Sequence, residues 1–138
     1  MFKKKESRND ERFYPKDSTY VVFSPGFVKR GPMINISRGG LGCLYFIDKT
    51  ARDWQIDQYI NIRCGTFTIG NIPFKIVSDK LLSDEQHGGH RIIRKRSIGF
   101  FGLSQYQKEQ IDYFIFNYTK KSLTDYKTNT DGFKLPFM

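Results

Sequence analysis

Two arginines near the N-terminus, Arg8 and Arg12, are four residues apart. A guanidinium group presents a rigid fork of hydrogen-bond donors, which fits two phosphate oxygens or the O6 and N7 edge of guanine and can also stack on a base. Two such groups on one short segment could therefore close over a guanine nucleotide. The pair alone also fits a solvated basic tail, since Pro15 and the polar residues around it argue against a stable helix.

A second candidate is the run NISRGG at positions 35–40, which lies between two apolar segments. Asn35 and Ser37 carry short polar side chains that hydrogen-bond the polar edge of a ligand or stabilise a turn. Gly40 allows unusual backbone angles and the close approach of a ligand. By itself the run is more typical of a turn between strands. Its order and distance relative to the arginine pair make a chance combination of the two features uncommon.

The sequence contains no recognisable nucleophile with its base and no pair of carboxylates typical of an enzyme. We therefore expect a protein that is not an enzyme and that holds no metal or other cofactor. His87 and His90 flank two glycines, but no cysteine or carboxylate cluster supports them, and a loop is the simpler interpretation. Cys43 and Cys64 form no CxxC pair and lie in apolar runs, so we expect buried, reduced thiols.

Size and charge limit the class of partner. The chain has 138 residues, a common size for one domain, and 23 Lys and Arg against 14 Asp and Glu give a net charge of +9. This surplus favours an anionic partner: nucleic acid, a nucleotide, an anionic lipid or an acidic protein surface. No stretch approaches the ~20 apolar residues of a membrane span, and no apolar segment follows the basic start, so we expect a cytoplasmic protein without a signal peptide.

Short runs rich in β-branched and aromatic residues predict six or seven strands. We expect them at 19–23, 27–36, 41–47, 59–63, 66–69, 72–77 and 91–101, with loops at 48–58 and 83–90. Gly31-Pro32 predicts a bend or a new strand inside the second run, and Gly70-Asn71 predicts a two-residue hairpin turn. Strands of this length and spacing indicate a small antiparallel barrel or sandwich.

One helix is predicted after the strands. Ser104 and Gln107 match a capping box, in which each side chain satisfies a free backbone amide at the start of the helix. An apolar stripe then follows helical spacing at Ile111, Phe114, Ile115 and Tyr118. We therefore divide the chain into a basic N-terminal arm at 1–18, expected to be mobile without a ligand, a domain of strands and helix at 19–118, and a C-terminal tail at 119–138.

These features together resemble the PilZ family. Its pattern of R-x-x-x-R near the start is matched by RNDER at 8–12, and its later D/N-x-S-x-x-G by NISRGG at 35–40. An aromatic residue and a proline follow Arg12 before the first strand, as is common in the family. The segment IGFFGLS at 98–104 resembles the end of its last strand and the start of its terminal helix. The resemblance implies a stand-alone, six-stranded antiparallel PilZ-type β-barrel with a C-terminal α-helix.

The resemblance also implies cyclic di-GMP as the ligand. The site residues that it implies are Arg8, Arg12, Asn35, Ser37 and Gly40, with Arg38 and Ser7 as additional candidate contacts. The two arginines would hold guanine and phosphate, and the second motif would line the other side. Asn35 stands where Asp is commoner, so it lacks the charge assistance of a carboxylate. Arg38 could add a phosphate contact, although a variable surface position is the simpler interpretation.

We thus expect a bacterial second-messenger sensor whose arm changes conformation on ligand binding and signals to a protein partner that the sequence does not identify. Motility, pilus function and exopolysaccharide synthesis are outputs of such domains. Two alternatives stay open. One is a basic β-barrel that binds nucleic acid, for which the charge and the many aromatic residues would suit. The other is a PilZ-like module that binds a partner protein and no ligand.

Overall fold

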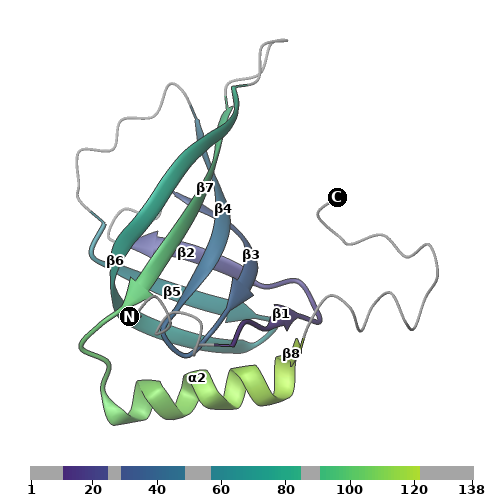
Figure 1. Ribbon diagram of the computed structural model, residues 1–138, viewed down its shortest axis with the longest axis vertical. Helices are drawn as coiled ribbons and strands as arrows, with labels where there is room; N and C mark the ends of the chain where they lie inside the picture. The colour runs from purple at the N-terminus through teal and green to yellow at the C-terminus, as the bar shows by residue number, and fades with distance from the viewer. Residues whose placement is uncertain (1–10, 25–28, 49–56, 85–90, 122–138) are drawn as a thin grey trace, which may run out of the picture.

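Six antiparallel strands close into a barrel, and one helix lies across its end (Figure 1). The computed structural model describes residues 11–24, 29–48, 57–84 and 91–121. The barrel strands are β2 (Tyr20–Ser24), β3 (Arg30–Ile36), β4 (Gly40–Asp48), β5 (Tyr59–Cys64), β6 (Phe67–Asp84) and β7 (Arg91–Phe100). They neighbour one another in the order β2-β3-β4-β7-β6-β5. The helix is α2 (Gln105–Tyr118), and β1 (Tyr14–Pro15) pairs with β8 (Thr119–Lys120) in a separate ribbon. The predicted barrel with a C-terminal helix is confirmed.

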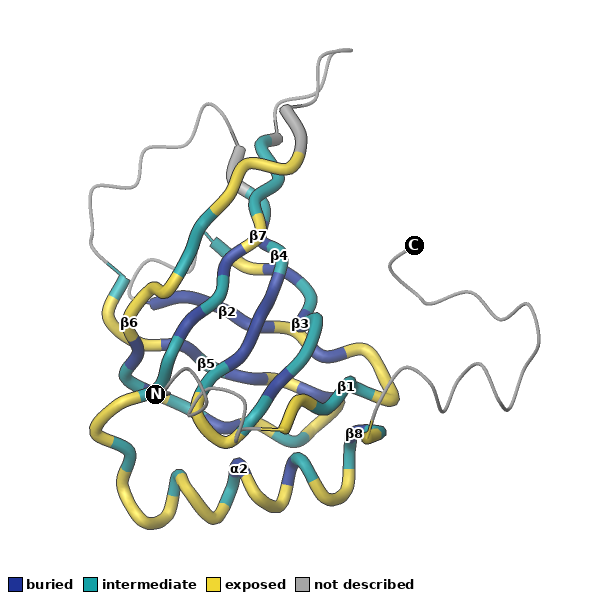
Figure 2. The backbone as a smooth tube through the Cα atoms, viewed as in Figure 1, coloured by how far each residue is buried: buried dark blue, intermediate teal, exposed yellow. Residues whose placement is uncertain are grey.

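The inward-facing apolar residues of the strands fill the barrel (Figure 2). On β5, Ile60, Ile62 and Cys64 are buried while Arg63 is exposed, which is the period of two expected for a strand with one face in the core. Cys64 and Cys43 are both free and buried, as predicted. Burial raises the pKa of the Cys43 thiol to about 12, so this thiol is protonated at neutral pH.

The predicted interruption at Gly31-Pro32 is wrong, because β3 runs through both residues. Pro32 has no N–H, but the next residue supplies a bond to the residue just before β2, since Met33 N–H donates to the Thr19 carbonyl at 2.8 Å. Gly31 is required by close packing, because a Cβ there would lie 2.1 Å from the Leu44 carbonyl oxygen of β4. The dipeptide therefore serves strand packing and does not divide the strand.

The predicted hairpin at Gly70-Asn71 is also wrong, because β6 is a single strand of 18 residues. The dipeptide instead lies at a bulge, where the register of β6 against β5 shifts between Ile60 and Ile62. Asn71 has a φ of 51°, and Gly70 is not among the described residues of positive φ, whereas a type I′ turn needs a positive φ at both positions. The turn between β5 and β6 is formed at Gly65, whose φ is 62°.

The predicted helix is confirmed with its capping box. Gln107 N–H donates to Ser104 Oγ at 3.0 Å, and Ser104 N–H donates to Gln107 Oε1 at 3.1 Å. The Gln107 side-chain amide also donates to the Gly70 and Asn71 carbonyls at 3.0 and 2.9 Å, which ties the start of α2 to the β6 bulge. Ile111 from the predicted stripe is buried against the barrel.

β1 and β8 pair antiparallel, with Pro15 opposite Thr119. β1 belongs to the segment predicted as an N-terminal arm, 1–18, and β8 to the segment predicted as a C-terminal tail, 119–138. The first ten residues of the arm and residues 122–138 of the tail lie outside the described part of the chain, as do most residues of the two predicted loops.

A cluster of ion pairs lies inside the barrel. Only 6% of the Arg96 side chain is exposed, and its guanidinium carbon stands 4.4 Å from the centre of the Tyr45 ring and 4.8 Å from that of Phe23. The same guanidinium pairs with Asp79 at 2.9 Å and with Asp57 at 3.3 Å. A buried cation is tolerated when it is paired and hydrogen-bonded, and Arg96 meets both conditions.

Asp79 accepts three hydrogen bonds in this cluster. The donors are Arg94 Nε at 2.6 Å, the Tyr45 hydroxyl at 2.8 Å and Arg96 Nε at 2.9 Å. Burial by itself would raise the pKa of Asp79, but these hydrogen bonds outweigh it and hold the pKa below its ordinary value. No local sequence pattern predicts this cluster, because its charged residues and Tyr45 come from β4, β6, β7 and the segment before β5.

Candidate ligand-binding site

The structure describes five of the seven predicted site residues. They come from the segment before β1, from the end of β3 and from the turn that leads into β4, and they are Arg12, Asn35, Ser37, Arg38 and Gly40. Ser7 and Arg8 lie outside the described residues. Of the predicted arginine pair, Arg12 can therefore be placed relative to the second motif.

A single antiparallel pair, Phe13 with Ile36, brings Arg12 to the second motif. Phe13 N–H donates to the Ile36 carbonyl at 2.8 Å, and Ile36 N–H donates to the Phe13 carbonyl at 2.9 Å. Residues that flank such a pair lie opposite each other, so Arg12 is in register with Ser37. Ile36 is buried and Phe13 packs against the core, so the alternating neighbours Arg12 and Ser37 share the outer face.

A bulge in β3 sets the direction of Asn35. Met33 pairs with Cys43 and Asn35 with Gly42, so two steps along β3 match one step along β4. This shift keeps Ile36 in the core and places Asn35 on the same outer face as Ser37. The Asn35 amide oxygen lies 3.2 Å from the point where a Cβ at Gly42 would stand, so glycine leaves room for the amide above β4.

Ser37 and Gly40 close the turn between β3 and β4. Ser37 N–H donates to the Gly40 carbonyl at 2.8 Å, and Gly39 N–H donates to Ser37 Oγ at 3.2 Å. A Cβ at Gly40 would lie 2.1 Å from the Ile98 carbonyl oxygen, so only glycine fits without a backbone shift. The two residues therefore have a structural role in the turn, and Ser37 shares its outer face with the segment that carries Arg12.

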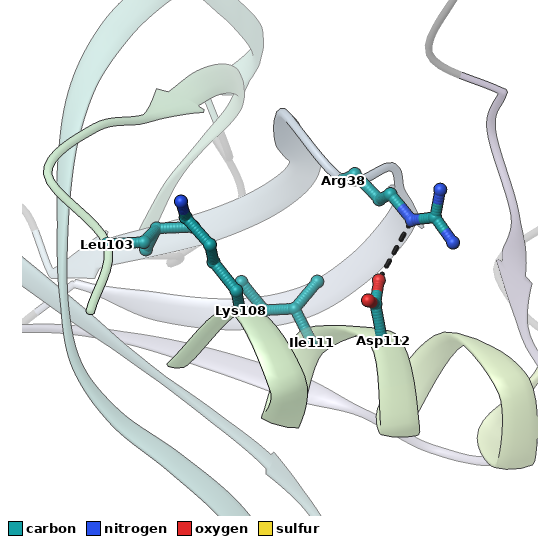
Figure 3. Close-up of a pocket in the computed structure, with 5 residues that line it drawn as sticks. All are labelled: Arg38, Leu103, Lys108, Ile111 and Asp112. Carbon is teal, nitrogen blue, oxygen red and sulfur yellow. Dashed lines mark hydrogen bonds and ion pairs between the residues drawn. The ribbon is translucent and has the colours of Figure 1, made fainter. Parts of the chain in front are cut away.

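Arg38 reaches from this turn to α2 and lines a hollow (Figure 3). Its Nε donates to Asp112 Oδ1 at 2.8 Å. The hollow has a volume of about 260 Å³, and its other lining residues are Leu103, Lys108, Ile111 and Asp112 itself. Two cations thus stand beside an apolar surface next to the second motif. An anion with a flat apolar part would suit such a surface.

The helix side of this hollow was missed by the sequence analysis. Lys108 and Asp112 are four residues apart and so lie one helical turn apart, which identifies them only as polar positions beside the apolar stripe. Arg38 meets Asp112 across 74 residues of chain, and no local pattern predicts such a contact. The capping box at Ser104 and Gln107 predicts where α2 begins, but it does not predict that α2 packs beside the β3–β4 turn.

The described side chains of the site are mostly hydrogen-bond donors that could hold an anion. Arg12 and Arg38 offer guanidinium donors, and Asn35 offers an amide that can both donate and accept. In the part of the chain that the structure describes, no group of three or more His, Cys, Asp or Glu residues could hold a metal ion. His87 and His90 lie outside that part. None of the described helices is long and apolar enough to cross a membrane.

Comparison with known proteins supports the fold. No protein-family model and no curated protein sequence matches the chain. Among solved structures, it is similar to the PilZ domain, with c-di-GMP, of YcgR from Escherichia coli, with a TM-score of 0.56, covering 91% of this chain and 98% of that chain. The two sequences are 15% identical, so the likeness is one of fold. The chain therefore has a PilZ-type fold, as the motifs implied.

Proposed function

We propose that this protein is a cyclic di-GMP receptor that is not an enzyme and that passes ligand binding on to a partner protein. The observation that carries the proposal is the Phe13–Ile36 pair, because it brings Arg12 of the first motif to the face of the second motif. The PilZ-type fold supports the same ligand, since the similar domain of YcgR was solved with c-di-GMP.

The residues have separate roles in this proposal. Arg12 would pair bidentately with a phosphate or with the O6 and N7 edge of a guanine. Asn35, two residues before Ser37 on the outer face, would hydrogen-bond the polar edge of the base. Gly40 would keep the β3–β4 turn tight so that the ligand can approach the backbone. Arg8 would approach from the arm as the second guanidinium.

Signalling would arise from the arm. The ligand would fix the segment before Phe13 against the barrel, at a cost of about 1–2 kcal/mol per ordered backbone residue. Charge-assisted hydrogen bonds of about 1.5–3 kcal/mol each would offset that cost. From Phe13 onward the backbone is already held by β3, so fewer residues need to be fixed. The rearranged surface would then engage a partner in a cytoplasmic pathway such as motility, pilus function or exopolysaccharide synthesis.

Isothermal titration calorimetry of the full chain tests the proposal. We expect saturable heat with cyclic di-GMP and much weaker binding of the linear dinucleotide of two guanines, which lacks the closed ring. Binding of single-stranded DNA with a steep salt dependence, and none of cyclic di-GMP, would instead favour the nucleic-acid alternative. No binding of either ligand, together with a protein partner that is indifferent to the dinucleotide, would favour the interaction module.

A further inference from the structure

One ion pair joins the second motif to the helix. Arg38 Nε lies 2.8 Å from Asp112 Oδ1, and 76% of the Arg38 side chain and 54% of the Asp112 side chain are exposed (Figure 3). Ion pairs as exposed as this one are weak, because water solvates both partners. The contact therefore orients Arg38 without binding it tightly.

The pair leaves most of the guanidinium free. Asp112 accepts from Nε alone, and neither terminal nitrogen of Arg38 has a hydrogen-bond or ion-pair partner among the described residues. A phosphate that takes two of these nitrogens side by side forms a stronger, bidentate pair. A phosphate ligand can thus outcompete Asp112 for Arg38.

A second cation stands at the same hollow. Lys108 lines it one helical turn before Asp112, and its ammonium has no ion-pair partner among the described residues. Leu103 and Ile111 supply the apolar surface of the hollow, whose volume is about 260 Å³. In Figure 3 the Arg38 guanidinium and the Lys108 ammonium point away from each other, but both side chains are long, so an anion in the hollow could draw both cations inward. The Asp112 carboxylate would repel the same anion.

We propose that this hollow is a phosphate subsite made by Arg38 and Lys108, and that Asp112 is a built-in competitor that lowers its affinity. The inference rests on the proposed function, because the phosphate would belong to the bound dinucleotide. Asp112 acts in two ways: it occupies Arg38 when no ligand is present, and it places a like charge beside the incoming phosphate. The helix thereby sets the affinity of a motif that is distant in sequence.

The test compares two substitutions that remove the same charge from α2. Asp112→Asn removes the competitor, whereas Glu109→Gln removes a carboxylate that hydrogen-bonds Gln105 and does not line the hollow. In calorimetric titrations with cyclic di-GMP at low salt, we expect Asp112→Asn to tighten binding about two- to fivefold, the range of an exposed ion pair. Glu109→Gln should change it less than about 1.5-fold. Circular dichroism checks that both variants keep the helix.

Two further variants identify the subsite. Lys108→Gln should weaken binding by a similar factor, and the effect of Asp112→Asn should fall to that of the Glu109→Gln control once Arg38 is replaced by Ala. Equal affinities for the Asp112 and Glu109 variants, or an unchanged affinity for Lys108→Gln, would overturn the inference while native binding upholds the proposed function. If the native chain itself binds no cyclic di-GMP, the proposed function and this inference both fail.

Discussion

Phe13 and Ile36 exchange two backbone hydrogen bonds, of 2.8 and 2.9 Å, and this pair fixes the position of Arg12 next to the second motif. Because the position depends on backbone bonds, it does not depend on the arginine side chain itself. A substitution at Arg12 can therefore remove ligand contacts and leave the barrel intact. Binding and folding can thus be measured separately at this site.

Asn35 offers a test of how the motif binds a base. We predict that Asn35→Asp tightens cyclic di-GMP binding about fivefold, because a carboxylate accepts from guanine N–H groups with charge assistance worth about 1 kcal/mol more than an amide. Asp has the same shape as Asn, so it fits the space above Gly42. Calorimetry measures the change, with Asn117→Asp on the exposed part of α2 as the control for charge. Equal or weaker binding by Asn35→Asp would show that the base does not contact this residue.

Gly40 and Gly99 are partners across β4 and β7, but they differ in the space around them. A Cβ at Gly40 would lie 2.1 Å from the Ile98 carbonyl oxygen, whereas the nearest atoms to a Cβ at Gly99 are 3.8 Å away. We predict that Gly40→Ala lowers the free energy of unfolding by about 1–3 kcal/mol and that Gly99→Ala changes it by less than about 0.5 kcal/mol. Urea denaturation compares the two variants. Equal midpoints would contradict the tight turn.

Arg96 is the central cation of the buried cluster. Replacing it with Met would leave Asp57 and Asp79 without their shared partner, and only 7% of the Asp57 side chain is exposed. We predict that Arg96→Met lowers the free energy of unfolding by about 3–5 kcal/mol. Lys95→Met, at the exposed neighbouring position, should stay within about 0.5 kcal/mol of the native value. Similar losses for both variants in urea denaturation would mean that the cluster does not stabilise the barrel.

The lowered pKa of Asp79 lets us predict how the free energy of unfolding depends on pH. Its pKa is held below the ordinary value of 3.8 in the folded state, so its stabilising contribution is complete above that value and is lost as pH falls through the folded pKa. The free energy of unfolding should therefore fall as the pH is lowered from about 5 toward 2. Tyr45→Phe, which removes one of the three donors to Asp79, should make this decrease shallower.

Chemical denaturation at a series of pH values measures that dependence, and Asp79→Asn supplies the limiting case. The Asn side chain does not titrate in this range, so the free energy of unfolding of the variant should change less with pH over the same window. A slope equal to that of the native protein would show that other carboxylates govern the acid response.

The motifs and the barrel could be predicted because their signals are local. Alternating apolar residues in runs such as Tyr59–Cys64 define a strand wherever they occur, and the capping box at Ser104 and Gln107 defines a helix start by itself. The two errors, at Gly31-Pro32 and Gly70-Asn71, concern residues that can serve either a turn or a strand. Their roles were decided by partners distant in sequence.

Gly70-Asn71 shows the physical reason. Asn71 N–H donates to the Asn61 side chain of β5 at 3.0 Å, and the Gln107 amide of α2 donates to both carbonyls of the dipeptide. These bonds satisfy the backbone at a bulge, so the strand continues where an isolated segment would turn. The helix side of the candidate site was missed for the same reason, because Arg38 meets Asp112 only after the chain has folded.

The most direct measurement is the affinity of cyclic di-GMP for the native chain, for Arg12→Ala and for Arg63→Ala, at one salt concentration. Arg63 is exposed on β5, so its loss removes the same charge outside the motifs. We predict that Arg12→Ala weakens binding about 10- to 100-fold, the loss expected for one or two charged hydrogen bonds, and that Arg63→Ala stays within about twofold of the native chain. Equal affinities for the two variants, or no binding by the native chain, would contradict the assignment of Arg12 to a cyclic di-GMP site.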